Sequence, residues 1–231
     1  MNELLTILGL VVLTSAALFL GWWLLIASEG VYLGRRVVVW LYDVFAPRYD
    51  AIKHFRREYD HRFLAQPLMA RISPNKAPLI LDVATGTGRL PLAMIRHAHF
   101  EGKIIGVDLS EPMLRHAWLK FIEERRVMLL QAPAERLPFA SNTFDGVSCL
   151  EALEFMIDHQ AALAEMVRVL KPGGVFLITN RINTRWMPGK TYDTETFVEL
   201  LFDAGIDDIH VEKWQVDYDR VWGIKPAEPS S

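Results

Sequence analysis

The sequence predicts an α/β protein in which one transmembrane helix precedes a doubly wound, mostly parallel seven-stranded sheet with helices on both faces. Three observations carry this prediction: an uncharged apolar run at the N-terminus, short apolar runs that alternate with helical patterns, and a glycine-bearing turn after the first apolar run. The chain has 231 residues, 51% of them hydrophobic, and a net charge of −3. This composition excludes a disordered chain and gives no basic surface for nucleic acid.

The first element is an apolar segment at residues 4–27, which contains no charged side chain and ends near Trp22 and Trp23. As a helix it would be about 36 Å long, enough for a hydrocarbon core of about 30 Å. A cleaved signal peptide is the alternative, but the preceding residues include Glu3 and no Lys or Arg. We therefore expect residues 1–29 to form an uncleaved anchor. The following Arg35 and Arg36 place the N-terminus outside and the remaining chain in the cytoplasm.

Residues 30–56 form a juxtamembrane segment. Its apolar stretch after the arginine pair fits either a helix lying along the membrane interface or a first helix packed on the domain, and the sequence favours neither. The single cysteine, Cys149, allows no disulfide within the chain, as suits a reducing compartment.

The next elements are the apolar runs and helical patterns of residues 57–225, which we assign to one catalytic domain. Strands are predicted at 79–83, 103–108, 127–130, 144–149 and 175–179, with helices at 90–99, 112–124 and 160–170 between them. A helix at 194–204 and strands at 209–213 and 215–222 complete the sheet, and residues 226–231 form a disordered tail.

The most informative segment lies between the first predicted strand and its helix. Gly86 and Gly88 let the backbone approach a ligand closely, and Asp108 ends the next strand about 20 residues later, where a carboxylate can accept hydrogen bonds from ribose hydroxyls. A dinucleotide fingerprint requires a third glycine at the position that Pro91 occupies. The pattern favours a nucleoside with an amino-acid tail over NAD.

Several motifs in order make the chain resemble a class I S-adenosylmethionine-dependent methyltransferase of the small-molecule type, which includes the ubiquinone/menaquinone biosynthesis methyltransferases. The resemblance implies a Rossmann-like fold and spans residues 42–225. The motifs are FAPRYD at 45–50, LDVATGTG at 81–88, VDLSEPML at 107–114, AERLPF at 134–139 and RVLKPGG at 168–174.

The resemblance also implies the site residues. The methionyl and ribose parts of S-adenosyl-L-methionine would lie against Asp82, Ala84, Gly86 and Gly88, with Asp108 on the ribose and Leu109 and Met113 beside the adenine. Ala134 would offer a backbone N–H to the adenine, and Tyr49 would close over the site. The family often has an acidic residue at the position of Pro133, so adenine recognition here is less polar or uses Glu135.

The acceptor side follows from the loop after the fourth predicted strand. Glu154 in this loop is the first candidate for a catalytic base, although a solvated helix carboxylate is an equal alternative. Arg181, Arg185 and Trp186 could meet an anionic or aromatic acceptor or lipid headgroups. No set of metal ligands is evident.

Two functions remain open from the sequence. The first is methyl transfer to a lipophilic, membrane-associated small molecule, either a quinone precursor or a lipid headgroup. The second is a non-catalytic, membrane-tethered scaffold that keeps the fold. The sequence does not identify the acceptor atom or the oligomeric state.

Overall fold

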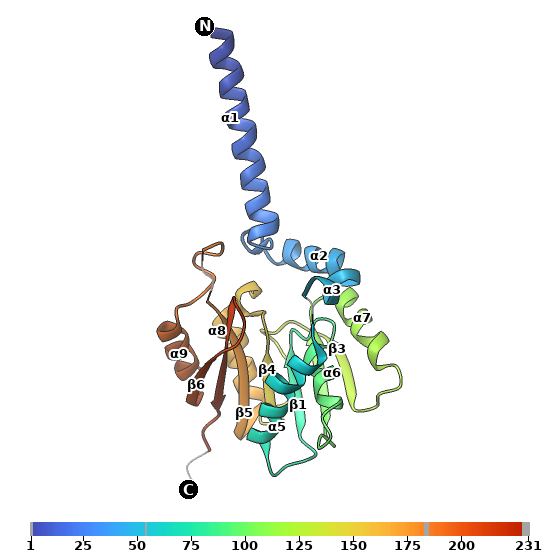
Figure 1. The fold of residues 1–231 in the computed structure, drawn as a ribbon. Helices are drawn as coiled ribbons and strands as arrows, with labels where there is room; N and C mark the ends of the chain where they lie inside the picture. The colour runs from blue at the N-terminus through green and yellow to red at the C-terminus, as the bar shows by residue number, and fades with distance from the viewer. Residues whose placement is uncertain (1, 54, 183–184, 228–231) are drawn as a thin grey trace.

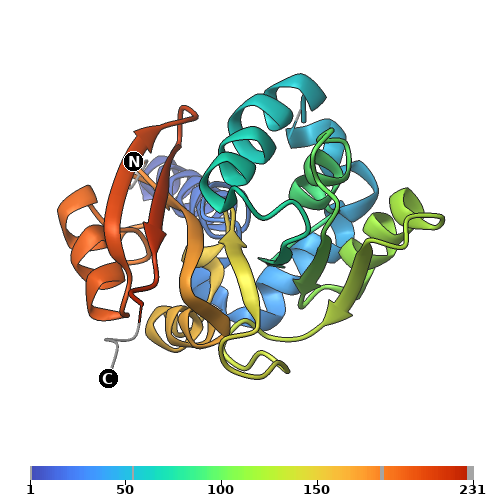
Figure 2. The same cartoon turned by 90° about the horizontal axis from the view of Figure 1, so that it is seen from below.

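Seven strands form one mixed sheet in the computed structural model, which describes residues 2–53, 55–182 and 185–227. The strand order is β3-β2-β1-β4-β5-β7-β6, and β7 runs antiparallel to both of its neighbours (Figures 1 and 2). The predicted seven-stranded, mostly parallel sheet is therefore confirmed, with β7 as the reversed strand. The strands are β1 (Leu79–Val83), β2 (Lys103–Asp108), β3 (Val127–Gln131), β4 (Phe144–Cys149), β5 (Leu170–Arg181), β6 (Asp207–Lys213) and β7 (Tyr218–Ile224).

Helices cover both faces of the sheet, as a doubly wound fold requires (Figure 2). One core packs α5 (Gln66–Ile72) and α6 (Arg89–Ile95) against the sheet, with Leu68 and Met94 fully buried. The other packs α8 (His159–Val169) and α9 (Thr194–Asp203), with Leu163 and Phe197 buried. At the β3 side lies α7 (Glu111–Phe121), whose N-terminus is capped by the Ser110 hydroxyl.

The N-terminal helix α1 (Asn2–Trp22) continues through a π-helical turn, η1 (Trp23–Ala27), and projects away from the domain (Figure 1). Residues Glu3–Ala27 have a mean hydropathy of 2.4, and the most apolar part of this segment is nowhere buried by the described part of the chain. Length and composition allow this helix to cross a membrane.

An aromatic cluster joins the end of this helix to the domain. The Trp22 ring meets the Trp186 ring edge-on with 5.6 Å between centroids, and Trp23 Nε1 donates to the Trp186 carbonyl at 3.2 Å. The Tyr32 hydroxyl donates to the Pro188 carbonyl at 2.6 Å. The loop after β5 thus holds the base of α1 against the top of the domain.

The juxtamembrane segment folds into several short helices above the carboxyl edge of the sheet. These are η2 (Val31–Leu33), α2 (Arg35–Phe45), η3 (Ala46–Arg48) and α3 (Tyr49–Lys53), followed by α4 (Arg57–Asp60) and η4 (His61–Ala65). Helix α2 contacts α7 of the domain, and its side chains Val38 and Leu41 are buried, whereas Trp40 and Val44 are exposed. The inner face of α2 therefore packs on the domain, which is one of the two arrangements that the sequence left open.

The largest departure from the predicted elements is at β5, which begins at Leu170 instead of residue 175. The sequence KPGG at 171–174 is typical of a turn, yet Gly173 N donates to the Lys225 carbonyl at 2.7 Å and Lys225 N donates to the Gly174 carbonyl at 3.1 Å. Pairing with Lys225, directly after β7, holds this segment in the strand, with Gly173 at φ of 74°. Of the predicted tail, residues 228–231 lie outside the described part of the chain.

Candidate cofactor and acceptor site

The turn after β1 is built from backbone conformations that favour glycine. Gly86 and Gly88 have φ of 55° and 83°, and Ala84 adopts φ of 55° without that freedom. A Cβ on Gly88 would lie 2.5 Å from the Phe121 ring of α7. Gly88 therefore begins α6 where no side chain fits, and its role is to let α6 and α7 approach each other.

Asp82 secures the base of this turn. Its carboxylate accepts hydrogen bonds from the Thr85 and Ser148 hydroxyls, both at 2.7 Å. Burial raises the pKa of Asp82 to about 6, and these two hydrogen bonds counteract only part of the effect. Asp82 lines a cavity of about 380 Å³ together with Thr87 and Arg89. The structure thus places it beside the glycine turn, as expected, with both carboxylate oxygens already holding the turn in place.

Asp108 lies at the end of β2, directly beside the turn. Its carboxylate accepts from Gly86 N at 2.7 Å and from Ser110 N at 2.9 Å, one hydrogen bond on each oxygen. Each oxygen keeps further acceptor capacity, and the residue lines the main cavity. Burial raises the pKa of Asp108, against the opposing effect of the two backbone N–H groups. This arrangement fits a pair of ribose hydroxyls.

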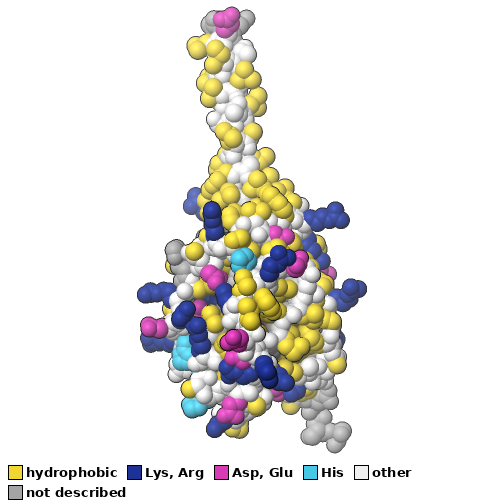
Figure 3. Space-filling model, turned by 90° about the vertical axis from the view of Figure 1, so that its right-hand side faces the viewer, with side chains coloured by type: hydrophobic (Ala, Val, Ile, Leu, Met, Phe, Trp, Pro, Cys, Tyr) yellow, Lys and Arg dark blue, Asp and Glu magenta, His cyan; other side chains and the backbone are white. Residues whose placement is uncertain are grey.

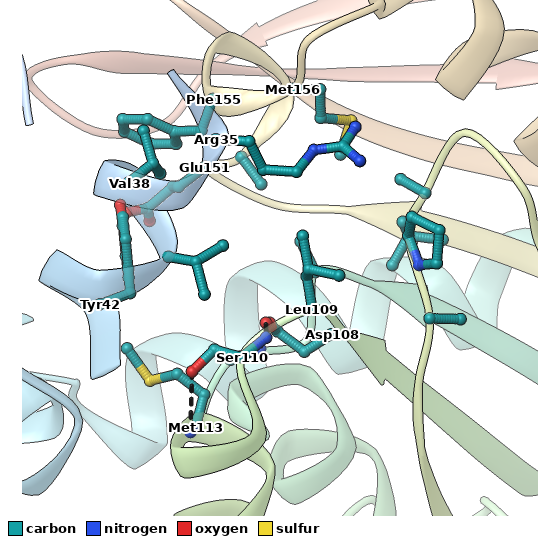
Figure 4. A pocket seen from close by; sticks show the side chains of 18 of the residues that line it. Arg35, Val38, Tyr42, Asp108, Leu109, Ser110, Met113, Glu151, Phe155 and Met156 are labelled. Carbon is teal, nitrogen blue, oxygen red and sulfur yellow. Dashed lines mark hydrogen bonds between the residues drawn. The ribbon is translucent and has the colours of Figure 1, made fainter. Parts of the chain in front are cut away.

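The main cavity has a volume of about 820 Å³ and opens at the carboxyl edge of β1, β2 and β4 (Figure 4). Beyond Asp108 and Ser110, its lining from residues 109–134 is apolar and suits an adenine ring, with Leu109, Met113, Ala132, Pro133 and Ala134. Of the residues expected to bind the cofactor, those that line it are Ala84, Gly86, Asp108, Leu109, Met113, Ala134 and Glu135.

Helices α2 and α3 cover this cavity. Arg35 of α2 extends across the cavity (Figure 4), and its guanidinium forms an ion pair with Glu135. The carboxylate expected to replace the missing acid at Pro133 is thus already engaged by a cation. Asp43 accepts from the Ser110 hydroxyl at 2.5 Å, and Asp50 accepts from the Thr87 hydroxyl. We call residues 35–53 the cover, because these contacts fasten them over the cavity.

Two tyrosines of the cover face the site. The Tyr49 ring lies over Gly86, 3.9 Å from the position of a Cβ there, and packs against the Tyr42 ring with 5.9 Å between centroids. Burial and nearby carboxylates raise the pKa of both phenols well above the ordinary value. Both remain protonated at neutral pH and can donate hydrogen bonds. Neither is poised to act as a phenolate base.

Glu151 is the acidic residue that the structure brings to the acceptor side. It lines both the main cavity and the smaller one, at a backbone φ of 52° directly after β4. Its carboxylate accepts from Arg89 Nη1 at 2.6 Å and from Gln215 Nε2 at 2.9 Å on one oxygen, and from Lys53 Nζ at 3.2 Å on the other. Two cations and an amide therefore fix its orientation.

Glu154, the residue expected to act as a base, lies elsewhere. It is buried behind the cavity wall and lines a separate small cavity, where its carboxylate accepts from the Tyr218 hydroxyl at 2.5 Å. The Arg181 Nη1 atom lies 3.4 Å from Oε1 of Glu154 and 3.4 Å from Oε1 of Glu29. Burial raises the pKa of Glu154. The geometry gives Glu154 no path to an acceptor in the main cavity and makes it part of a buried network.

The main cavity is also lined by residues that have no role predicted from the sequence, above all Arg35, Tyr42 and Phe155. For Glu151, the sequence predicts only that its loop after the fourth strand lies on the acceptor side. For Glu151 a signal existed, since it follows β4 by two residues and so lies at the same sheet edge as Asp108. For Arg35 and Tyr42 no local pattern exists. They reach the cavity only because α2 folds back over a glycine turn some 45 residues later in the chain.

Comparison with known proteins supports the same assignment. A methyltransferase domain family matches residues 81–178. Ubiquinone/menaquinone biosynthesis C-methyltransferase UbiE of Cupriavidus necator is 32% identical over 165 residues, which is 71% of this chain and 68% of that protein. Demethylmenaquinone methyltransferase of Lactiplantibacillus plantarum is 37% identical over 136 residues, 58% of this chain. The chain thus spans 57% of the length of the Lactiplantibacillus plantarum protein, little more than half of it.

Solved structures share the fold. An S-adenosylmethionine-dependent methyltransferase from Aquifex aeolicus superposes with a TM-score of 0.62 and 21% identity, over 79% of this chain and 98% of the other. The [4+2]-cyclase SpnF gives a TM-score of 0.70 at 19% identity, over 84% and 98%. At such identities the likeness shows the fold alone. From the matched sequence relatives, the chain belongs to the ubiquinone/menaquinone C-methyltransferase family of S-adenosylmethionine-dependent methyltransferases.

Proposed function

We propose that this protein transfers a methyl group from S-adenosyl-L-methionine to a lipophilic quinone precursor at a membrane surface. The observation that carries the proposal is the position of the covered cavity. Its floor is the glycine turn with Asp108. Its cover begins with α2, a short distance along the chain after a helix long and apolar enough to span a bilayer. The names of the matched relatives support a quinone precursor over a lipid headgroup.

The residues present fit the cofactor. Asp108 would bind the ribose hydroxyls, and Leu109, Met113 and Ala134 would surround the adenine. The smaller cavity beside Asp82 and Gly86 would take the methionyl end, where the Asp82 carboxylate favours an ammonium group. When bound, this cofactor supplies an electrophilic methyl group on a positively charged sulfur.

The protein's own contribution is orientation and proton removal. A carbon acceptor must lose a proton before or during methyl transfer. We assign this task to Glu151, because it is the carboxylate on the wall shared by the two cavities, whereas Glu154 is turned away from both. Lys53 and Arg89 hold the Glu151 carboxylate in place. Tyr49 covers the site and excludes water from it.

The anchor belongs to the same proposal. Residues 1–29 would cross the membrane once, with the N-terminus outside and the catalytic domain in the cytoplasm, because Arg35 and Arg36 follow the span. Trp22, Trp23 and Trp186 gather at its base, where an aromatic belt would meet the headgroups. The anchor confines the search for a membrane-resident acceptor to the membrane surface.

Methyl transfer can be tested with the full chain reconstituted in lipid vesicles that contain a demethylated quinol and isotopically labelled methyl donor. We expect label in the extracted quinol, with a mass gain of one CH₂ group. Glu151→Gln should lower kcat with little change in donor affinity, and the matched variant Glu154→Gln should lower it much less. Label confined to water-soluble acceptors, or the same loss of kcat in both variants, would contradict the proposal.

A non-catalytic scaffold is the second candidate, and Pro133, which replaces an acid common in the family, is the observation in its favour. Isothermal titration calorimetry separates the two at the first step. A scaffold that has lost its cofactor site would show no heat of binding with S-adenosylmethionine. The intact contacts of Asp108 with Gly86 and Ser110 predict binding instead.

A further inference from the structure

A second apolar cavity, of about 580 Å³, lies between the end of the N-terminal helix and the cover. Its walls come from the last turn before Ser28 and from α2 and α3. The apolar side chains that line it are Leu25, Ile26, Leu41, Phe45 and Ile52. We call this cavity the anchor groove. It has no counterpart in the roles assigned above, since neither the cofactor nor the base uses it.

The anchor groove is contiguous with the main cavity. Tyr42 and Tyr49 line both spaces, so their two rings form the partition between them. The polar groups of the groove also lie towards this partition: the Tyr42 hydroxyl donates to Glu29 at 3.0 Å, and Lys53 donates to Glu151 at 3.2 Å. The inner end is therefore polar and adjoins the site of methyl transfer.

The outer end of the anchor groove is apolar and open. Ile26 and Ile52 are 56% and 53% exposed, and Leu25 and Phe45 are also exposed. Phe45 and Ile52 thus continue the uncharged apolar surface of residues 4–27. Figure 3 shows hydrophobic side chains running from the helix onto the adjoining part of the domain. An open apolar groove of this kind costs free energy in water unless an apolar partner fills it.

We infer that the anchor groove holds the apolar tail of the methyl acceptor, while the acceptor's reactive head passes the two tyrosines into the main cavity. This inference rests on the proposed function and names the place where its substrate class is recognised. A long-tailed acceptor matches both ends of the groove: the tail remains beside the candidate span, and the head reaches Glu151. A free phosphate or a water-soluble acceptor would leave Ile26 and Ile52 uncovered.

The first test compares two acceptors in vesicles containing the full chain: demethylmenaquinol, and the same head group without its tail. Phe45→Ser and Ile52→Ser each remove apolar contact from the groove, and Val44→Ser is the matched control, an exposed residue of α2 that does not line it. We expect the ratio of kcat/KM for the tailed to the tailless acceptor to fall about tenfold in both groove variants. The control should keep the wild-type ratio.

A ratio that stays within about twofold of wild type in both groove variants would overturn the inference. An equal fall in Val44→Ser would also overturn it, because the effect would then come from general contact with the bilayer. If the wild-type chain methylates neither acceptor, the proposed function itself fails, and the groove is judged by the second test.

The second test does not depend on methyl transfer. A demethylmenaquinol analogue with a photoreactive group in its tail is crosslinked to the full chain in vesicles, and the labelled peptides are mapped by mass spectrometry. Labels on Leu25, Ile26 or residues 45–52, reduced in Ile52→Ser, support the groove as the tail site. Labels only on residues 4–20, the part of the helix away from the domain, would mean that the tail stays in the lipid and would refute the inference.

Discussion

Replacing Asp108 by asparagine keeps the size of the side chain and changes one acceptor oxygen into a donor. The two carboxylate oxygens accept from Gly86 N and Ser110 N, so the NH₂ of the new amide must face one of these two N–H groups. The other oxygen keeps its partner. We therefore expect the turn to loosen on one side only, and the ribose to lose at least one hydrogen bond to a charged acceptor.

The size of the effect follows from these contacts. One hydrogen bond to a charged group contributes about 1.5–3 kcal/mol. Losing one such bond to the ribose should raise the Kd for S-adenosylmethionine by about 10–150-fold. The free energy of unfolding should change less, because burial already raises the pKa of Asp108 and removing the buried charge offsets part of the lost bond to the backbone.

The assay is isothermal titration calorimetry on the full chain in detergent, with thermal unfolding as the check on folding. Asp203→Asn is the matched control, since Asp203 is an exposed carboxylate at the end of α9. A Kd for Asp108→Asn within about threefold of wild type, in a folded protein, would refute the assignment of Asp108 to the ribose. An equal loss in Asp203→Asn would show that the titration reports net charge.

Two further predictions concern the turn after β1. Burial raises the pKa of Asp82 from 3.8 to about 6, so the folded protein binds a proton that the unfolded chain has released, and this carboxylate lowers stability as pH rises through about 4–6. In urea unfolding, the stability of Asp82→Asn relative to wild type should therefore rise by about 2 kcal/mol between pH 4 and 7. Gly88→Ala should lower the free energy of unfolding by about 2 kcal/mol or more, measured by urea unfolding, and should weaken cofactor binding, measured by calorimetry. The reason is that the new Cβ would lie 2.5 Å from the Phe121 ring, on a residue whose φ is 83°.

Each of these has a clear contrary result. If the free energies of unfolding of Asp82→Asn and wild type differ by the same amount at every pH from 4 to 7, Asp82 is ionised throughout this range. For the glycine, Gly189→Ala is a suitable comparison, since Gly189 has φ of 74° and no atom of the described residues within 4 Å of the added Cβ. If both alanine variants lose the same stability, backbone strain and not contact with Phe121 is the cause.

The central strands could be predicted from the sequence because a buried parallel strand requires apolar residues on both faces. The predicted bounds of β1, β2 and β4 agree with the structure at both ends. The bounds of the strands at the antiparallel side, β6 and β7, were harder to predict. All residues of β6 are exposed or half-buried, so the strand lacks a buried apolar pattern. Its pairing with β7 depends on where the reversed strand returns, which no local pattern specifies.

The cofactor side of the site was predictable for the same topological reason: Asp82, Gly86 and Asp108 are fixed by strand ends and their turns. The acceptor side was not. Glu151 and Glu154 are three residues apart, and the left-handed backbone at Glu151 decides which of them faces the cavity. Composition and spacing do not reveal that conformation, because a non-glycine residue rarely adopts it.

The seven residues between Ala27 and Arg35 have a consequence for turnover. They include Gly30 and Gly34, both at positive φ, and they connect the candidate span to the first residue of the cover. In a membrane-anchored protein these residues would keep α2 within reach of the bilayer surface. Every exchange of the spent cofactor past α2 would then take place beside the membrane, where the acceptor is proposed to reside.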